Sequence, residues 1–133
     1  MNYLTDPADL RALFASVAGR LSPSGVFVFD SNVESHYVRN SPFSREEEWQ
    51  GETVQHTMDY DRGTREVRIV FSFADGSVEV HRQRPYDLDE LSFNLAEAGL
   101  GVVECYSNPE RDDVDPSIGR VLCVARKVHV APT

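Results

Sequence analysis

Two ring side chains that can exchange protons follow a short apolar stretch near the start of the sequence. The stretch GVFVFDSNVESHY contains Asp30, Asn32, His36 and Tyr37 after its apolar residues. Ligands of α/β sheets bind at the carboxyl ends of strands, so Asp30 and Asn32 are candidate substrate-binding residues. His36 and Tyr37 are candidate catalytic residues, with His36 as a base. The alternative interpretation is a polar turn followed by a solvated loop pair.

A second set of candidates lies within residues 54–84, where apolar and polar residues alternate. His56 is in phase with Val54 and Met58, so it either lines a substrate pocket or is a packed histidine on a buried face. Arg82 and Arg84 have the chemistry to hold a carboxylate or phosphate of a substrate. Ordinary ion pairs with neighbouring acidic residues are the alternative for both arginines. We therefore predict His56, Arg82 and Arg84 as substrate-binding residues.

Several other kinds of site are not supported by the residue spacing. The four histidines and two cysteines show no HxxxH, HxH or CxxC pattern, so we predict no metal site. The sequence also contains no nucleophile elbow and no P-loop. Cys105 and Cys123 lie in apolar, strand-like segments, which favours two reduced core thiols over a disulfide.

Length and charge limit the classes of partner. A chain of 133 residues is long enough for one domain with its own core, and its net charge is −9, from 13 basic and 22 acidic residues. This charge argues against binding to nucleic acid or to an anionic membrane surface. Apolar runs are shorter than the roughly 18 residues that a membrane span needs. The N-terminus lacks the basic and apolar regions of a signal peptide, so we expect a cytoplasmic protein.

The first predicted elements are a helix and a strand. In TDPADLRALFASVAGRL, Asp6 is suited to cap a helix and Pro7 to occupy its first position. The apolar residues that follow have helical spacing. The next stretch, Val26 to Phe29, is apolar at every position, which predicts a strand buried on both faces of a parallel sheet. Residues 1–32 thus form the helix and strand of a sheet.

Residues 33–86 are predicted to form an antiparallel insert of three strands. Asp75-Gly76 is a strong signal for a two-residue hairpin turn. A turn centred there places Phe71 opposite Val80 and turns His81 toward solvent. Strand alternation then makes the apolar face of the insert cationic toward one end.

Residues 87–127 are predicted to form a helix and a closing strand pair, followed by a tail at 128–133. Asp87 and Glu90 have the spacing of a capping box, and Gly99 is placed to end the helix. Strands follow at 102–106 and 121–125, joined by the acidic loop NPERDDVDPSIG.

These segments, in this order, resemble the C-terminal half of a class I S-adenosylmethionine-dependent methyltransferase. The matching segments are MNYL, LRALFASVAGRLSPSGVFVFDSN, HRQRPYDLDELSFNLAEAGLGVVECY and GRVLCVARK, which together span about residues 1–127. The resemblance is to small-molecule methyltransferases, including sugar N-methyltransferases, although SPSG stands where the family reads RPGG. It implies an α/β fold: part of a Rossmann-like sheet, strands 5–7 of the family with flanking helices, plus a three-stranded antiparallel meander.

The resemblance also implies S-adenosylmethionine as cofactor, with Asn2 and Tyr3 at the edge of its site. The family's glycine loop and the acidic residues that hold the cofactor are absent, and Gly99-Leu100-Gly101 follows a helix and is interpreted as a helix stop. The implied function is the substrate-binding and lid portion of a methyltransferase acting on a small molecule. Activity would then require a complementary half or a homo-oligomer. The alternatives are a non-catalytic dimerisation or partner-binding module and an unrelated α+β ligand-binding domain.

Overall fold

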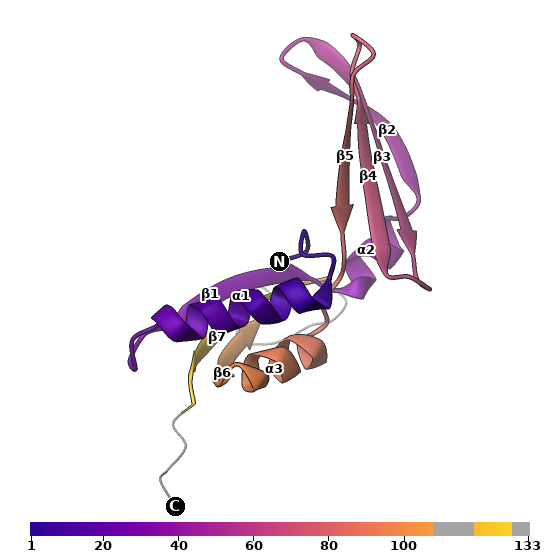
Figure 1. Ribbon diagram of the computed structural model, residues 1–133. Helices are drawn as coiled ribbons and strands as arrows, with labels where there is room; N and C mark the ends of the chain where they lie inside the picture. The colour runs from indigo at the N-terminus through magenta and orange to yellow at the C-terminus, as the bar shows by residue number, and fades with distance from the viewer. Residues whose placement is uncertain (108–118, 129–133) are drawn as a thin grey trace, which may run out of the picture.

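The computed structural model describes residues 1–107 and 119–128, and the acidic loop at 108–118 and the tail at 129–133 lie outside these ranges. Two antiparallel sheets are present in the described part. The first has the order β1-β7-β6, and the second has the order β2-β3-β4-β5. Figure 1 shows the second sheet projecting from an α/β body, with α2 near the junction. The elements are α1 (Pro7–Arg20), β1 (Phe27–Asn32), α2 (Glu34–Asn40), β2 (Phe43–Trp49), β3 (Glu52–Asp61), β4 (Glu66–Ser72), β5 (Val78–Gln83), α3 (Leu88–Glu97), β6 (Leu100–Tyr106) and β7 (Arg120–Lys127).

Helix α1 begins as the sequence predicts. The side chain of Asp6 accepts a hydrogen bond from the backbone N–H of Ala8 at 2.9 Å, and Pro7 occupies the first turn. Leu10 and Phe14 are fully buried on the face that packs against the first sheet. The predicted α/β class is confirmed by this body, in which two helices cover a sheet.

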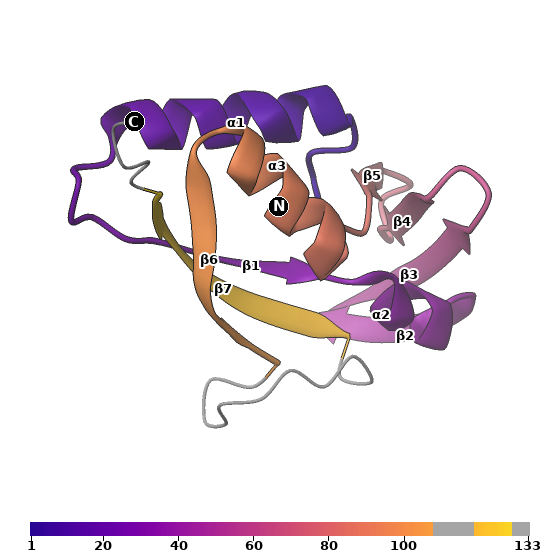
Figure 2. The same cartoon turned by 90° about the horizontal axis from the view of Figure 1, so that it is seen from below.

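The first sheet is covered on one face only in the described part of the chain. Figure 2 shows α1 and α3 on the same side of β1, β6 and β7, and Phe14 contacts Phe27 and Phe29 from that side. On the other face Val26 is 46% and Val28 55% exposed. The prediction of a strand buried on both faces of a parallel sheet is therefore wrong. β1 pairs antiparallel with β7, and no described helix covers its second face (Figure 2).

The second sheet has four strands where the sequence predicts three. The extra strand is β2, with the sequence FSREEEW, which pairs with β3 along its whole length. Three consecutive glutamates have low strand propensity, so the pattern did not indicate a strand. Gln50 and Gly51 both have positive φ angles, 51° and 82°, as a two-residue type I′ hairpin turn requires.

The register between β4 and β5 differs by one residue from the predicted one. Phe71 is opposite Glu79, where the prediction placed Val80. The backbone N–H of Phe73 donates to the carbonyl of Ser77, so the loop holds three residues and not two. A shift of one residue exchanges the faces of a strand. The orientation predicted for His81, toward solvent, is therefore wrong.

The capping box predicted for α3 is also wrong. Asp87 makes no side-chain cap to its own helix, and its Oδ1 accepts from the backbone N–H of Glu34 at 3.0 Å. Asp87 therefore caps α2, a helix that the sequence analysis did not predict within the antiparallel insert. Glu90 pairs instead with Arg84. Gly99 has a φ angle of 83°, which confirms it as the left-handed residue that ends α3.

The two cysteines face each other across β6 and β7. Their Sγ atoms are 3.7 Å apart, and both thiols are free. Burial, reinforced by the neighbouring Cys105, raises the pKa of Cys123 to about 12. The thiol of Cys123 is therefore protonated and unreactive near neutral pH.

Among the described helices, none has the length and the apolar character that a membrane span requires.

Candidate functional site

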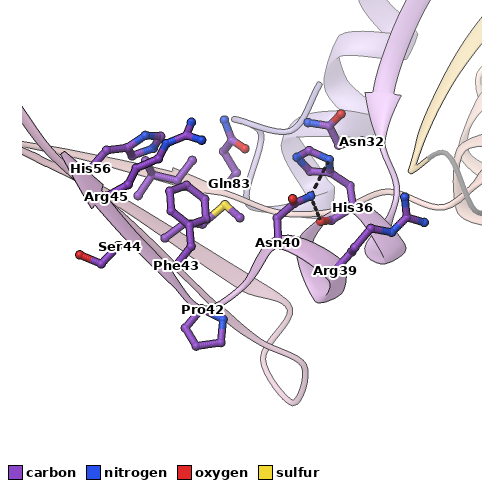
Figure 3. A pocket seen from close by; sticks show the side chains of 12 residues that line it. Asn32, His36, Arg39, Asn40, Pro42, Phe43, Ser44, Arg45, His56 and Gln83 are labelled. Atoms are coloured by element: carbon purple, nitrogen blue, oxygen red, sulfur yellow. Dashed lines mark hydrogen bonds between the residues drawn. The ribbon is translucent and has the colours of Figure 1, made fainter. Parts of the chain in front are cut away.

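A cavity of about 670 Å³ lies where the end of β1 and helix α2 meet one face of the second sheet. Figure 3 shows Asn32, His36 and Asn40 on one side of it and Phe43, His56 and Gln83 on the other. Its remaining lining residues are Arg39, Pro42, Ser44, Arg45, Met58 and Ile69. The lining contains arginines and histidines but no carboxylate, although the chain as a whole is strongly acidic. The cavity is therefore suited to a polar small molecule.

Asn32 is fixed at the cavity by Asn2. The side-chain oxygen of Asn2 accepts from the backbone N–H of Asn32 at 2.9 Å, and its Nδ2 donates to the carbonyl of Asn32 at 2.9 Å. The same Nδ2 lies 3.0 Å from the carbonyl of Arg84 and 3.3 Å from Ser31 Oγ. Asn2 is itself buried. It therefore joins the N-terminal segment, the end of β1 and the segment after β5 at one point.

Tyr37 lies beneath the cavity, with 1% of its surface exposed. Its hydroxyl donates to Gln83 Oε1 at 2.8 Å and accepts from Asn32 Nδ2 at 3.4 Å. Burial raises the pKa of Tyr37 to about 12, with an opposing contribution from the Asn32 hydrogen bond. Tyr37 is therefore protonated near neutral pH. It holds two lining side chains, Asn32 and Gln83, in fixed positions.

His36 lines the cavity from the first turns of α2. Burial, and secondarily the positive charge of Arg39, lowers the pKa of His36 below its ordinary value of 6.5. Its imidazole is therefore neutral at pH 7 and able to accept a proton. Asn40 Nδ2 donates to the carbonyl of His36 at 2.7 Å, and Gly119 packs against the backbone of His36.

His56 combines the two interpretations that the sequence left open, because it is packed and also lines the cavity. Its ring stacks on Phe71 with centroids 4.4 Å apart and meets the edge of Phe43 at 4.8 Å. Its Nδ1 lies 3.1 Å from Glu47 Oε1. The same carboxylate oxygen accepts from Arg45 Nε at 2.7 Å. Hydrogen bonds from His56, Arg45 and Trp49 lower the pKa of Glu47.

The other predicted substrate-binding residues do not line this cavity. Asp30 forms an ion pair with Arg120, and the exposed Arg82 lies 3.5 Å from a Glu66 carboxylate oxygen. Arg84 forms a two-point ion pair with Glu90, at 2.9 and 3.1 Å, and lies over the ring of Tyr86. The hydrogen bond to Glu90 raises the pKa of Arg84, against the opposing effect of burial.

Asn2 and Tyr3, the residues predicted at the cofactor edge, do not form a cofactor site by themselves. The polar atoms of Asn2 are engaged within the protein, and Tyr3 is bonded through its hydroxyl to His81. Neither residue borders the cavity. The described residues therefore do not fit S-adenosylmethionine without a further surface. In the described ranges no cluster of three or more metal-ligating side chains is found.

Sequence reasoning missed much of the cavity wall, notably Arg39, Asn40, Phe43, Arg45 and Gln83. The signal for Gln83 was available, because it alternates with His81 along the predicted third strand. Arg39 and Asn40 were missed because α2 was not predicted. Phe43 and Arg45 were missed because β2 was not predicted.

Solved structures share this fold, although no family model and no curated protein matches the sequence. An S-adenosylmethionine-dependent methyltransferase from Clostridium acetobutylicum ATCC 824 matches 95% of this chain and 54% of its own, at 20% identity and a TM-score of 0.79. The CcbJ methyltransferase from Streptomyces caelestis matches 94% of this chain and 56% of its own, at 19% identity and a TM-score of 0.74. CalS10, an amino pentose methyltransferase from Micromonospora echinaspora, was solved with bound S-adenosylmethionine. It matches 96% of this chain and 54% of its own, at 21% identity and a TM-score of 0.62.

The chain therefore has the fold of part of these methyltransferases, and the resemblance seen in the sequence is confirmed at the level of the fold. It spans about half the length of the structures that it matches.

Proposed function

We propose that this chain is the substrate-binding part of an S-adenosylmethionine-dependent methyltransferase that acts on a small molecule. The observation that supports this most directly is the fold match over about 95% of the chain to about half of such enzymes. The cavity between α2 and the second sheet supplies a place for the methyl acceptor. In this proposal the cofactor is held by a complementary half that carries the glycine loop.

Within the cavity, His36 is proposed as a base and Tyr37 as the residue that positions its neighbours. A neutral imidazole can take the proton that an N–H or O–H acceptor loses on methylation. Tyr37 keeps Asn32 and Gln83 oriented toward the substrate through its buried hydroxyl. His56 is proposed as an aromatic wall for the substrate. S-adenosylmethionine supplies the transferable methyl group when it is bound.

The open edge of β1 is the proposed contact for the complementary half. In the described residues β1 pairs with β7 on one side only, and Val26 and Val28 are exposed beside that edge. An unpaired strand edge with exposed valines is a surface on which another strand can add. Pairing between two copies of this chain is the second candidate, and the same edge would serve it.

Calorimetric titration of S-adenosylhomocysteine tests the proposal. The purified chain alone is expected to show no binding. A fusion to the half of the Clostridium acetobutylicum methyltransferase that this chain does not match is expected to bind at micromolar concentration. A fusion that folds but fails to bind would contradict the proposal. Micromolar binding by the chain alone would show that no complementary half is needed.

A further inference from the structure

We propose that Tyr3, His81 and Glu79 form a proton relay whose outer member, Tyr3 Oη, exchanges a proton with the substrate. The proposal rests on the proposed function, because an N–H or O–H methyl acceptor must lose a proton. Tyr3 Oη lies 3.0 Å from His81 Nδ1, and His81 Nε2 lies 2.6 Å from Glu79 Oε1. The three groups therefore form two consecutive hydrogen bonds from an exposed phenol to a carboxylate.

The carboxylate determines the direction of both hydrogen bonds. An ionised carboxylate only accepts, so in the neutral ring His81 carries its hydrogen on Nε2 and donates it to Glu79. Nδ1 then has a free lone pair and accepts from the hydroxyl of Tyr3. The oxygen of Tyr3 is left with lone pairs that can accept a proton from another molecule. This is the arrangement of a nucleophile or base, an imidazole and an orienting carboxylate found in hydrolase triads.

The relay lies on the same face of the second sheet as the cavity. His81 is paired with Ile69 in the sheet register, and Ile69 lines the cavity. Gln83, two residues along β5 and on the same face, also lines it. The ring of His81 packs edge-on against Phe71, with centroids 5.4 Å apart, which restricts its orientation. Tyr3 itself is 61% exposed, so a bound molecule can reach it.

The proton transfers balance within these three residues and the substrate. Tyr3 Oη receives the proton of the substrate's N–H or O–H group while the phenolic proton moves to His81 Nδ1. The imidazolium that results is stabilised by the Glu79 carboxylate, and it later returns its proton to water. Tyr3 does not border the cavity, so the relay acts on a substrate that extends from the cavity along this face of the sheet, and there it takes the proton in place of His36. Tyr3 is then a catalytic residue, and His81 and Glu79 are positioning residues that act through it.

The reactivity of Tyr3 toward N-acetylimidazole tests the relay in the chain as it exists. The phenol oxygen attacks the acetyl carbon and gives its proton to His81, the acetyl–nitrogen bond breaks, and the leaving nitrogen takes up that proton from His81 to depart as neutral imidazole. Peptide mass spectrometry is expected to show Tyr3 acetylated about tenfold faster in the native chain than in His81→Phe. Glu79→Gln is expected to lie between them. Arg82→Gln, on the opposite face of β5, is the matched control and is expected to keep the native rate.

Equal acetylation of Tyr3 in the native chain and in His81→Phe would overturn the relay. If His81→Phe fails to fold by circular dichroism, His81→Gln replaces it, because glutamine is smaller and polar. Nitrogen-15 spectra of the native chain provide a second measurement, with the Nε2–H form of His81 expected and the Nδ1–H form contradicting the proposal.

The fusion described above separates failure of the relay from failure of the proposed function. A fusion that binds S-adenosylhomocysteine but shows no effect of His81→Phe on Tyr3 reactivity would leave the proposed function standing without the relay. A fusion that does not bind would remove the proposed function whatever the reactivity of Tyr3. Once a methyl acceptor is found, His81→Phe is expected to lower kcat about tenfold with little change in KM.

Discussion

Two arginines predicted to bind substrate, Arg82 and Arg84, form ion pairs within the protein instead of lining the cavity. Arg82 and Arg84 look equivalent in the sequence, yet Arg84 is held by Glu90 and the ring of Tyr86, whereas Arg82 stands on the surface beside Glu66. The side chain of Arg84 is 14% exposed and that of Arg82 is 67% exposed. Their contributions to stability should therefore differ.

Replacing each arginine by alanine measures this difference. Arg84→Ala is expected to lower the free energy of unfolding by about 2 kcal/mol, because it leaves Glu90 without its two-point partner in a partly buried position. Arg82→Ala is expected to change it by less than about 0.5 kcal/mol, as is typical of an exposed ion pair. Urea unfolding of both variants is the measurement. Similar losses for the two would contradict the assignment of Arg84 to a structural role.

The lowered pKa of His36 gives a prediction of pH dependence. In the folded chain the nuclear magnetic resonance titration of His36 is expected to have its midpoint below 6.5. Arg39→Gln is expected to move that midpoint upward, because it removes the positive charge that disfavours imidazolium. Arg45→Gln, whose guanidinium pairs with Glu47, is the control and is expected to leave the midpoint unchanged.

The lowered pKa of His36 also determines how stability changes with pH. The unfolded chain binds the His36 proton more readily than the folded chain does. The contribution of this group to stability is therefore complete above about pH 6.5 and is lost as the pH falls below that value. A His36 midpoint above 6.5 in the native chain would contradict both statements.

At the scale of elements, α2 depends on contacts from distant parts of the chain. Its N-cap residue, Val33, provides no side-chain cap, and Asp87, which precedes α3, accepts from the N–H of Glu34 instead. The backbone N–H of Val33 donates to the carbonyl of Gly119 at 2.9 Å. A helix of this length is not stable by itself, so these contacts determine where His36 and Tyr37 lie.

Gly119→Ala tests the dependence of α2 on the segment before β7. Gly119 has a φ angle of 84°, and an added Cβ would lie 2.9 Å from the Cα and Cβ of His36. The substitution is expected to cost about 2 kcal/mol or more and to shift the resonances of His36. Gly19→Ala is the matched control, because a Cβ there meets nothing within 4 Å in helix α1. It is expected to stabilise the chain slightly by helix propensity. Thermal unfolding of both variants is the measurement. Equal melting temperatures for the two variants would contradict the expectation.

At the scale of the whole molecule, residues 1–107 and 119–128 leave one face of the first sheet without a covering helix and one edge of β1 without a paired strand. Helices α1 and α3 cover the opposite face (Figure 2). Exposed valines on a strand edge favour association with another chain or segment. The molecule as described is therefore expected to associate at high concentration.

Light scattering over a range of concentrations tests this expectation. The native chain is expected to form dimers or larger species, and Val28→Lys is expected to reduce them without lowering the melting temperature, because Val28 is 55% exposed. Val78→Lys, at a similarly exposed position in the second sheet, is the comparison. A monomer at every concentration, or association abolished by Val78→Lys alone, would show that the β1 edge is not the contact surface.

Local chemistry and periodicity in the sequence were sufficient for several features of this protein. The cap at Asp6, the stop at Gly99, the alternation of Val54, His56 and Met58 and the order of the main segments all follow from interactions between near neighbours in the chain. The resemblance to a methyltransferase rests on that order, and the fold agrees with it. Asn32, His36 and His56, which the sequence offered as separate candidates, line one cavity in the structure.

Only the tertiary structure decided the rest, because it depends on contacts between residues far apart in the chain. β2 forms because β3 is present to pair with it, and α2 forms because Asp87 and Gly119 hold its first turn. The face on which His81 lies was decided by a three-residue loop that shifted the register by one position. Such contacts leave no periodic signal in the sequence, and so the cavity and the hydrogen bonds that join Tyr3, His81 and Glu79 became visible only in three dimensions.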